Sequence, residues 1–209
     1  MSQGLFLSLD GVDGAGKSTQ CRLLAEWLRG LGRTVTLCRD PGGTPIGDRV
    51  RELLLDPSGS MSAVTESFLY MASRTLLVDQ VIRPAMARGE VVLTDRFLLA
   101  SVVYQGHAGS VPVSALWEMG RLATGGLMPE VTFVLDLPAE VGLTRKNTAR
   151  DRMESKGPGF LEQVRQGFLA EARRQPERIL VVNAMKPIDV LQAELRQEVG
   201  RVLERADRP

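Results

Sequence analysis

The sequence predicts an α/β fold in which a parallel sheet of five strands lies between two layers of helices. Short apolar runs of strand length alternate along the 209 residues with longer segments of helical period. The first apolar run also leads through a glycine-rich turn straight into a helical segment. Strands separated by helices are typical of parallel sheets, which are covered on both faces. Because this length suits one domain, we expect residues 1–209 to fold as a single domain.

Each predicted element has its own signal. The apolar runs that we interpret as strands are Leu5–Leu9, Thr34–Cys38, Val91–Thr94, Val131–Asp136 and Arg178–Val182. The segments with helical spacing are Lys17–Leu31, Ala63–Met86, Pro112–Thr124, Pro138–Arg150, Phe160–Arg174 and Ile188–Val202. In the first of these helices, Leu24, Leu28 and Leu31 share one face. Arg39–Gly47 is rich in proline and glycine and is a predicted loop.

Composition excludes several classes of protein. The chain has 26 basic and 25 acidic residues, whereas a nucleic-acid binder normally has a basic excess, so an anion site must be built locally. No window approaches the roughly 18 apolar residues of a membrane span, and residues 1–4 lack the features of a signal peptide. The cysteines, Cys21 and Cys38, lie in separate elements and are expected to be reduced. We therefore expect a cytoplasmic protein without a nucleic-acid or membrane partner.

The glycine-rich turn carries a phosphate-binding motif. Residues 11–18 read GVDGAGKS and match G-x-x-x-x-G-K-S/T between a predicted strand and a predicted helix, as the motif requires. Its backbone N–H groups and the helix N-terminus should cradle phosphate oxygens, and Lys17 should reach the β- and γ-phosphates. The residues expected to contact the nucleoside triphosphate are Gly11, Val12, Asp13, Gly14, Ala15, Gly16, Lys17, Ser18 and Thr19. The motif predicts the P-loop NTPase form of the α/β sandwich.

A magnesium site is expected beside this turn. The Ser18 hydroxyl occupies the motif position that holds Mg²⁺. Asp95 ends the predicted strand Val91–Thr94, as a Walker-B aspartate does, and strand ends of this kind face the ligand in open α/β sheets. We therefore predict Ser18 and Asp95 as the protein ligands of Mg²⁺.

The P-loop alone does not choose between an ATPase, a GTPase switch and a kinase. The guanine-reading sequence N-K-x-D is absent from the chain. A small-molecule kinase needs a second anion pocket and a mobile cationic cover that excludes water. Candidates for the pocket follow predicted strands or lie on a helix, and candidates for the cover cluster before a Gly-Pro-Gly break. These residues are Arg39, Arg74 and Arg96, and then Arg145, Lys146, Arg150 and Arg152. The set favours a kinase, although each residue alone is more often a surface charge.

With these features the sequence resembles the bacterial thymidylate kinases, from Leu5 to about Val202. Four ordered blocks carry the resemblance. They are DGVDGAGKST at 10–19, RDPGGTPIG at 39–47, DRF at 95–97 leading to YQG at 104–106, and DRME at 151–154. The first block is shared widely among P-loop proteins, whereas the second and third are much more specific. The resemblance implies a nucleoside monophosphate kinase that transfers the γ-phosphoryl group of ATP to thymidine monophosphate, and it implies a homodimer.

The resemblance also implies roles for individual residues. Arg39 and Arg96 match arginines that hold the acceptor phosphate, for which a guanidinium fork is well suited. Asp13 matches a carboxylate near the 3′-hydroxyl of the acceptor sugar. The residues expected beside the acceptor base or deoxyribose are Tyr70, Arg74, Tyr104 and Gln105. Because Gly14 is not an arginine, the catalytic arginine is expected from a lid at about residues 145–158, with Arg145 and Arg150 as candidates beside Lys17, Arg96 and Asp13.

Some positions depart from the family pattern and leave the acceptor open. Asp40 stands where glutamate is usual, Ala100 where serine or threonine is usual, and Tyr70 where phenylalanine is usual. Residues 107–110 read HAGS without the common arginine, and His107 is a predicted loop residue. A kinase for another nucleotide or a deoxynucleoside, or a P-loop switch without catalysis, remain the alternatives.

Overall fold

A computed structural model describes residues 4–145, 152–153 and 156–206 of the chain. In these ranges, five parallel strands form one sheet in the order β2-β3-β1-β4-β5. The strands are β1 (Leu5–Gly11), β2 (Val35–Arg39), β3 (Val91–Asp95), β4 (Val131–Asp136) and β5 (Ile179–Asn183). All five predicted strands are confirmed, and so is the parallel sheet.

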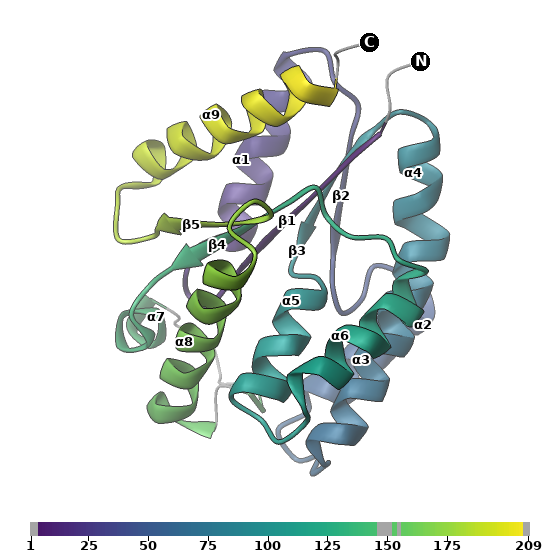
Figure 1. Cartoon of the computed structure of the whole chain (residues 1–209), viewed down its shortest axis with the longest axis vertical. Coiled ribbons are helices and arrows are strands. Elements are labelled where there is room, and N and C mark those ends of the chain that lie inside the picture. The colour runs from purple at the N-terminus through teal and green to yellow at the C-terminus, as the bar shows by residue number, and fades with distance from the viewer. Residues whose placement is uncertain (1–3, 146–151, 154–155, 207–209) are drawn as a thin grey trace.

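Helices pack on both faces of this sheet (Figure 1). The α-helices of the described residues are α1 (Lys17–Gly30), α2 (Pro45–Leu55), α3 (Ala63–Leu77), α4 (Arg83–Ala87), α5 (Leu98–Ser101), α6 (Val113–Thr124), α7 (Ala139–Arg145), α8 (Pro158–Arg174) and α9 (Ile188–Ala206). Two π-helical turns, η1 (Val78–Ile82) and η2 (Val102–His107), continue α3 and α5. The α/β sandwich with helices on either side of a parallel sheet is therefore the predicted three-layer architecture.

The central strand shows why the sheet needs two covers. Leu5, Leu7 and Leu9 of β1 are buried in a cluster with residues of α1, α8 and α9. Phe6, which alternates with them, is buried in a second cluster with residues of α3, α4, α5 and α6. Side chains alternate across a strand, so an apolar run such as β1 is stable only with helices on both faces.

Two predicted segments differ in detail. The helix expected over Ala63–Met86 is interrupted at η1, which ends two residues before Pro84 near the start of α4. Proline has no N–H for the helical ladder, and a π-turn is one way to continue past it. The loop expected over Arg39–Gly47 ends early because Thr44 caps α2 by accepting from the Gly47 N–H at 3.0 Å. Pro45 follows at the first helical position, where proline is favourable.

The segment after β3 is more helical than expected. We predicted no helix over residues 98–107, and His107 as a loop residue, but α5 and η2 span this stretch. His107 ends η2 with its Nε2 2.8 Å from Glu171 Oε1, so its loop assignment was wrong. The helix expected over Pro138–Arg150 begins at Ala139, and residues 146–150 lie outside the described residues.

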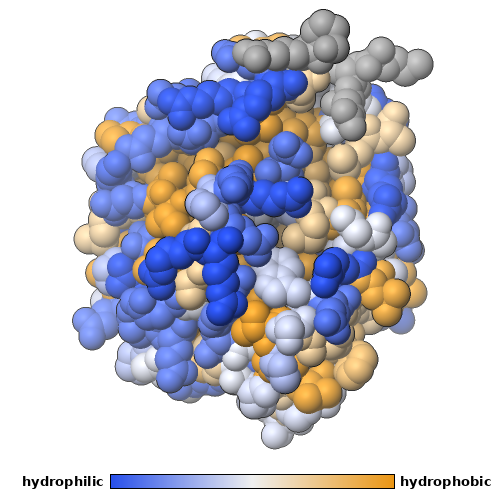
Figure 2. All heavy atoms as spheres, in the orientation of Figure 1, coloured by the Kyte–Doolittle hydropathy of each residue, from blue (hydrophilic) through white to orange (hydrophobic). Residues whose placement is uncertain are grey.

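This face of the surface mixes hydrophilic side chains with several apolar areas, one of them over the region of α2, α3 and α6 at the lower right of the view (Figure 2). Large exposed apolar residues on these helices are Ile46, Leu53, Val64, Phe68 and Leu122. Among the described residues, no helix has both the length and the apolar character needed to cross a membrane.

Candidate active site

The turn between β1 and α1 has the backbone geometry that the motif predicts. Gly14 and Gly16 have φ of 78° and 92°, in the left-handed region that glycine adopts without strain. Gly16 precedes α1 and has no side chain to cap it. The first N–H groups of α1 are therefore open to an anion, and the helix dipole adds partial positive charge there.

Gly14 is also required by a close approach. A Cβ at Gly14 would lie 2.2 Å from the backbone oxygen of Gly142 in α7. A Cβ at Gly142 would in turn lie 2.3 Å from the backbone oxygen of Asp13. The P-loop and α7 thus touch through two glycines. An arginine at position 14 does not fit this packing, so a cation for the transferred group must come from elsewhere.

Lys17 lies under the turn. It is buried, and its Nζ donates to the backbone oxygens of Val12 at 2.9 Å and Gly11 at 3.3 Å. Burial and then the nearby Arg96 charge lower the pKa of Lys17, while Asp13 and Asp95 oppose that shift. An arriving phosphate would offer this ammonium a stronger partner than neutral carbonyls do.

Ser18 and Asp95 come together although 77 residues separate them. The Ser18 hydroxyl donates to Asp95 Oδ2 across the mouth of the turn. No group of three or more His, Cys, Asp or Glu suited to a metal occurs in the described part of the chain. Mg²⁺ in phosphoryl-transfer sites needs only one or two protein oxygens, because phosphates and waters complete its octahedron. This hydroxyl and carboxylate fit such an ion.

Arg96 follows β3 in a backbone conformation that is uncommon for a residue other than glycine. Its φ is 70°, which costs about 1–3 kcal/mol unless the surroundings enforce it. Its guanidinium donates to Gly11 O at 2.8 Å, Asp13 Oδ1 at 2.7 Å and the Tyr104 hydroxyl at 3.2 Å. The Tyr104 hydroxyl in turn donates to Asp13 Oδ2 at 3.3 Å. The strained residue is thus held against the P-loop, where its charge faces the cavity.

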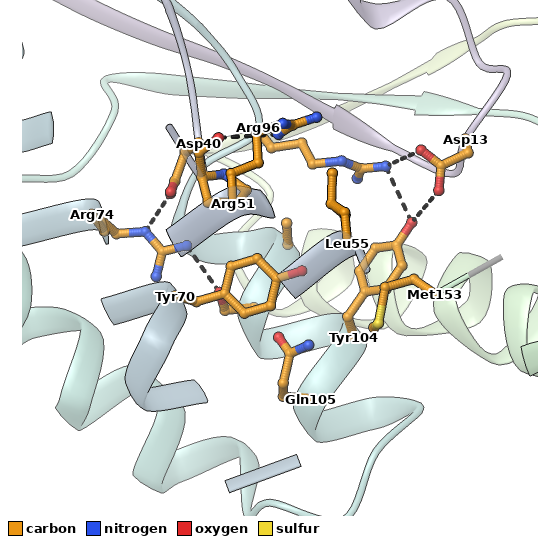
Figure 3. Close-up of a pocket in the computed structure, with 13 residues that line it drawn as sticks. Asp13, Asp40, Arg51, Leu55, Tyr70, Arg74, Arg96, Tyr104, Gln105 and Met153 are labelled. Atoms are coloured by element: carbon orange, nitrogen blue, oxygen red, sulfur yellow. Dashed lines mark hydrogen bonds and ion pairs between the residues drawn. The ribbon is translucent and has the colours of Figure 1, made fainter. Parts of the chain in front are cut away.

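Two adjoining pockets open around Arg96. The P-loop pocket is lined by Asp13, Gly14, Gly16, Lys17, Ser18, Thr19, Arg39, Asp40, Arg51, Asp95 and Arg96. The inner pocket is lined by Asp13, Asp40, Pro41, Arg51, Leu55, Tyr70, Arg74, Arg96, Ala100, Ser101, Tyr104, Gln105 and Met153, and Figure 3 shows these side chains converging on it. Asp13, Asp40, Arg51 and Arg96 belong to both, so the pockets form one cleft.

Arg74 is part of the floor of the inner pocket. Its Nε donates to Asp40 Oδ2 at 2.5 Å, and its Nη2 donates to Ser101 Oγ at 2.9 Å and Phe97 O at 3.3 Å. Arg74 and Asp40 are almost completely buried. Burial raises the pKa of Asp40, and the Arg74 charge opposes that rise. These bonds already engage most of the N–H donors of the Arg74 guanidinium. A contact between Arg74 and an acceptor base therefore stays a prediction.

Arg51 is a site residue that the sequence interpretation missed. It lines both pockets and donates to Pro41 O at 3.0 Å. Burial and then the Arg39 charge lower its pKa, as expected where cations gather to meet an anion. Gly47, Arg51 and Leu54 have the i, i+4, i+7 spacing of one helical face, and both neighbours are buried. This spacing could have found Arg51 once α2 was recognised.

The remaining candidates lie in different surroundings. Arg39 lines the P-loop pocket and reaches Asp48 Oδ1 at 3.1 Å. Arg145 ends α7 and donates to Ala184 O at 3.1 Å, which directs it towards the loop after β5. Arg152 lines neither pocket and is buried in contact with Glu66. Arg150, with most of the predicted lid, lies outside the described residues.

Comparisons with known proteins agree on one family. A sequence model described as "Thymidylate kinase" matches residues 9–195. A thymidylate kinase of Rhodopirellula baltica is 47% identical over 89% of this chain and 76% of its own length. One from Deinococcus radiodurans is 46% identical over 93% of this chain and 96% of its own. The crystal structure of thymidylate kinase from Ehrlichia chaffeensis superposes with a TM-score of 0.78 at 26% identity, covering 94% of this chain and 99% of that one.

Proposed function

The chain belongs to the thymidylate kinase family and catalyses the ATP-dependent phosphorylation of thymidine monophosphate to thymidine diphosphate, and we propose how its residues divide this work. The observation that carries the proposal is the joined cleft, in which Asp13, Arg51 and Arg96 belong to both pockets. One pocket has a P-loop, and the other has aromatic and amide side chains. Two nucleotides can therefore meet phosphate to phosphate at Arg96.

ATP occupies the P-loop pocket. The N–H groups of residues 11–19 surround its phosphates, and Lys17 moves from the Val12 and Gly11 oxygens to the β- and γ-phosphates. Ser18 and Asp95 would hold Mg²⁺, which supplies positive charge to the phosphate oxygens when bound. The crowding of Lys17, Arg51 and Arg96 supports this placement, because such cations repel one another until an anion arrives.

Thymidine monophosphate occupies the inner pocket, with its phosphate at the shared arginines. Arg51 and Arg96, which belong to both pockets, and Arg39, which lines the P-loop pocket, bind the phosphate by forked hydrogen bonds. The base lies among Tyr70, Arg74 and Gln105, and the sugar lies near Asp13 and Tyr104. The Asp13 carboxylate accepts from Arg96 and Tyr104, so it is already oriented for a sugar hydroxyl.

Transfer then requires alignment more than proton removal. The acceptor phosphate oxygen is anionic at neutral pH, so it attacks the γ-phosphorus without a strong general base. Arginines lower the barrier by neutralising the charge that spreads over the equatorial oxygens. Arg96 supplies one such charge at the cleft. Arg145 and Arg150 remain our candidates for a second positive charge, because the packing at Gly14 leaves no room for an arginine in the P-loop itself.

A panel of acceptors tests the substrate directly. Formation of ADP is followed by a coupled assay with thymidine monophosphate, deoxyuridine monophosphate, deoxycytidine monophosphate, other monophosphates and thymidine. We expect thymidine monophosphate to give the highest kcat/KM and thymidine to give none, because a nucleoside lacks the attacking phosphate. Turnover that is faster with another acceptor, or with water alone, contradicts the proposal.

A homodimer is the assembly that we propose. Large apolar side chains are exposed on α2 and α3, at Ile46, Leu53 and Phe68, and on α6, at Leu122, and they support this proposal because burying apolar surface favours association. Light scattering after size exclusion should give twice the chain mass of 22.8 kDa. Single-domain folding and a cytoplasmic location stay predictions from the sequence.

A further inference from the structure

Glu66 is a buried carboxylate to which the proposed mechanism gives no role. It lies in α3 and is 1% exposed. Its Oε2 accepts from Gln105 Nε2 at 3.0 Å, and its Oε1 accepts from Arg152 Nη1, with Lys156 Nζ 3.5 Å away. Buried charges are costly unless paired in this way. The carboxylate thus joins η2 to the chain before α8, one oxygen to each side.

This contact determines which way the Gln105 amide faces. An ionised carboxylate only accepts hydrogen bonds, so it selects the NH₂ end of the amide and leaves the oxygen end on the other side. Gln105 Oε1 is buried and has no hydrogen-bond partner among the described residues. Gln105 lines the inner pocket, and its amide points towards the space between Tyr70 and Tyr104 (Figure 3). Leaving a buried acceptor of this kind without a hydrogen-bond donor costs about 1–3 kcal/mol, so a ligand that supplies a donor is favoured.

We infer that Glu66 is a positioning residue for base selection, which orients Gln105 so that Oε1 accepts from an N–H group on the ring of the acceptor base. This inference rests on the proposed function, because it places the base in the inner pocket. Thymine carries an N–H between its two carbonyl groups. Cytosine has an unprotonated nitrogen at the same position, so two acceptors would face each other there.

Arg152 and Lys156 serve the same arrangement. Arg152 is buried, and its Nε donates to Leu54 O at 2.9 Å while its Nη1 meets Glu66 Oε1. Lys156 approaches the same oxygen. Both cations approach Oε1, so Oε2 remains for Gln105.

Glu66→Gln tests the inference with a side chain of nearly the same shape. The new amide can donate to Gln105 Oε1, so Gln105 can turn its NH₂ group to the base. We expect the ratio of kcat/KM for thymidine monophosphate to that for deoxycytidine monophosphate to fall about 10-fold or more. Most of the change should lie in KM for thymidine monophosphate, with KM for ATP unchanged. Glu198→Gln in α9, whose carboxylate pairs with Arg201 at the surface, is the matched control and should keep the ratio.

The Gln105→Leu variant serves as a second background, which separates an effect of Glu66 on the position of Gln105 from an effect on stability. In Gln105→Leu the ratio should already be low, and adding Glu66→Gln should not lower it further. A Glu66→Gln variant that melts earlier but keeps the wild-type ratio overturns the inference, as does an equal loss in both backgrounds. Wild-type preference for thymidine monophosphate tests the proposed function separately, because it can hold while Glu66 proves irrelevant.

A measurement on the wild-type protein needs no variant to be active. The Gln105 side-chain NH₂ signal, assigned in NMR spectra by its loss in Gln105→Leu, should exchange slowly with solvent because Glu66 holds it in a buried site. Rapid exchange of that NH₂ group in the ligand-free protein would contradict the arrangement.

Discussion

The P-loop pocket and the inner pocket meet at Arg96 but are built in different ways. The P-loop pocket takes six of its lining residues from one continuous turn between Asp13 and Thr19, and Arg39 and Arg96 beside that turn are partly exposed. The inner pocket takes two lining residues from each of α2, α3, α5 and η2, and several of these side chains are buried and bonded to one another. Phosphate binding therefore depends on a local turn and the charges beside it, whereas base recognition depends on a packed, preorganised network.

An ion pair in each region shows the contrast. In the pair that faces the P-loop, Arg96 and Asp13 have side chains that are 16% and 23% exposed. In the pair beneath the inner pocket, Arg74 and Asp40 are 1% and 0% exposed. A partly open pair can exchange partners when a ligand arrives, whereas a buried pair cannot separate without leaving a charge in an apolar medium. We expect changes at Arg96 to appear in kinetics and changes at Arg74 to appear in stability.

Arg96→Ala should give the largest effect. It removes a guanidinium that the proposal places on both the acceptor phosphate and the transferred group, so kcat/KM for thymidine monophosphate should fall by about 10³-fold or more. Saturation by the acceptor should be lost while ATP still binds in a fluorescence titration. The melting temperature should fall less than in Arg74→Met, because water can reach the Asp13 carboxylate that is left behind. Retained saturation by the acceptor would refute the assigned role.

Arg74→Met should mainly destabilise the fold. It leaves Asp40 buried without its partner, and breaking a buried pair in this way costs about 3–5 kcal/mol, of which we expect the lower end here. Urea denaturation at pH 7 measures the loss. Adding Asp40→Asn should recover part of it, since the remaining group is then neutral. If the double variant is less stable than Arg74→Met alone, the buried charge is not the cause.

The same contrast explains what the sequence could predict. Lys17 and Ser18 belong to a motif whose spacing determines its geometry, and Asp95 ends an apolar strand that the sequence revealed. Their meeting could therefore be predicted although Asp95 is far along the chain. Gln105 and Tyr70 were found only through a family resemblance, because no local pattern brings η2 to α3.

Residues that depend wholly on tertiary packing were missed. Arg51 enters the cleft because α2 begins at a Thr44 cap inside a stretch that looked like a loop. Glu66 looks like a surface residue in the first turn of a helix, yet Gln105 and Arg152 bury it. Only contacts between distant segments distinguish such a glutamate from an exposed one.

Asp10 is a buried carboxylate on the P-loop side, and unlike Asp40 it accepts no hydrogen bond from an arginine of the described residues. Its hydrogen bond comes from Ser8 Oγ at 3.0 Å, and burial raises its pKa from 3.8 to about 6, opposed first by Arg96. Because the folded-state pKa is the higher one, its contribution to stability is fully present below pH 4 and is lost as the pH rises through about 6. Above that pH the folded state carries an ionised, poorly solvated group.

Asp10→Asn removes this titration. Relative to wild type, the variant should gain stability between pH 4 and 6 and keep a constant advantage above that range, on the order of 3 kcal/mol at about 1.4 kcal/mol per pKa unit. Urea denaturation at pH 4, 5, 7 and 8 measures the difference. Glu26→Gln, in an exposed pair with Arg22, is the control and should show no such gain. An advantage that does not depend on pH would assign the effect to packing.

Thr44→Ala should give the smallest effect and shows whether the two pockets respond separately. Thr44 is buried and caps α2 through the Gly47 N–H, so its loss should cost about 1 kcal/mol. Because α2 carries Arg51 into the cleft, KM for thymidine monophosphate should rise a few-fold while KM for ATP stays unchanged, since the P-loop does not depend on that cap. Ser62→Ala removes a comparable cap from α3, where the acceptor is Ser62 Oγ and the donor the Thr65 N–H at 3.1 Å. Equal changes in both KM values for Thr44→Ala would mean that α2 supports the whole cleft, and the division between a local phosphate turn and a separately packed base pocket would not hold.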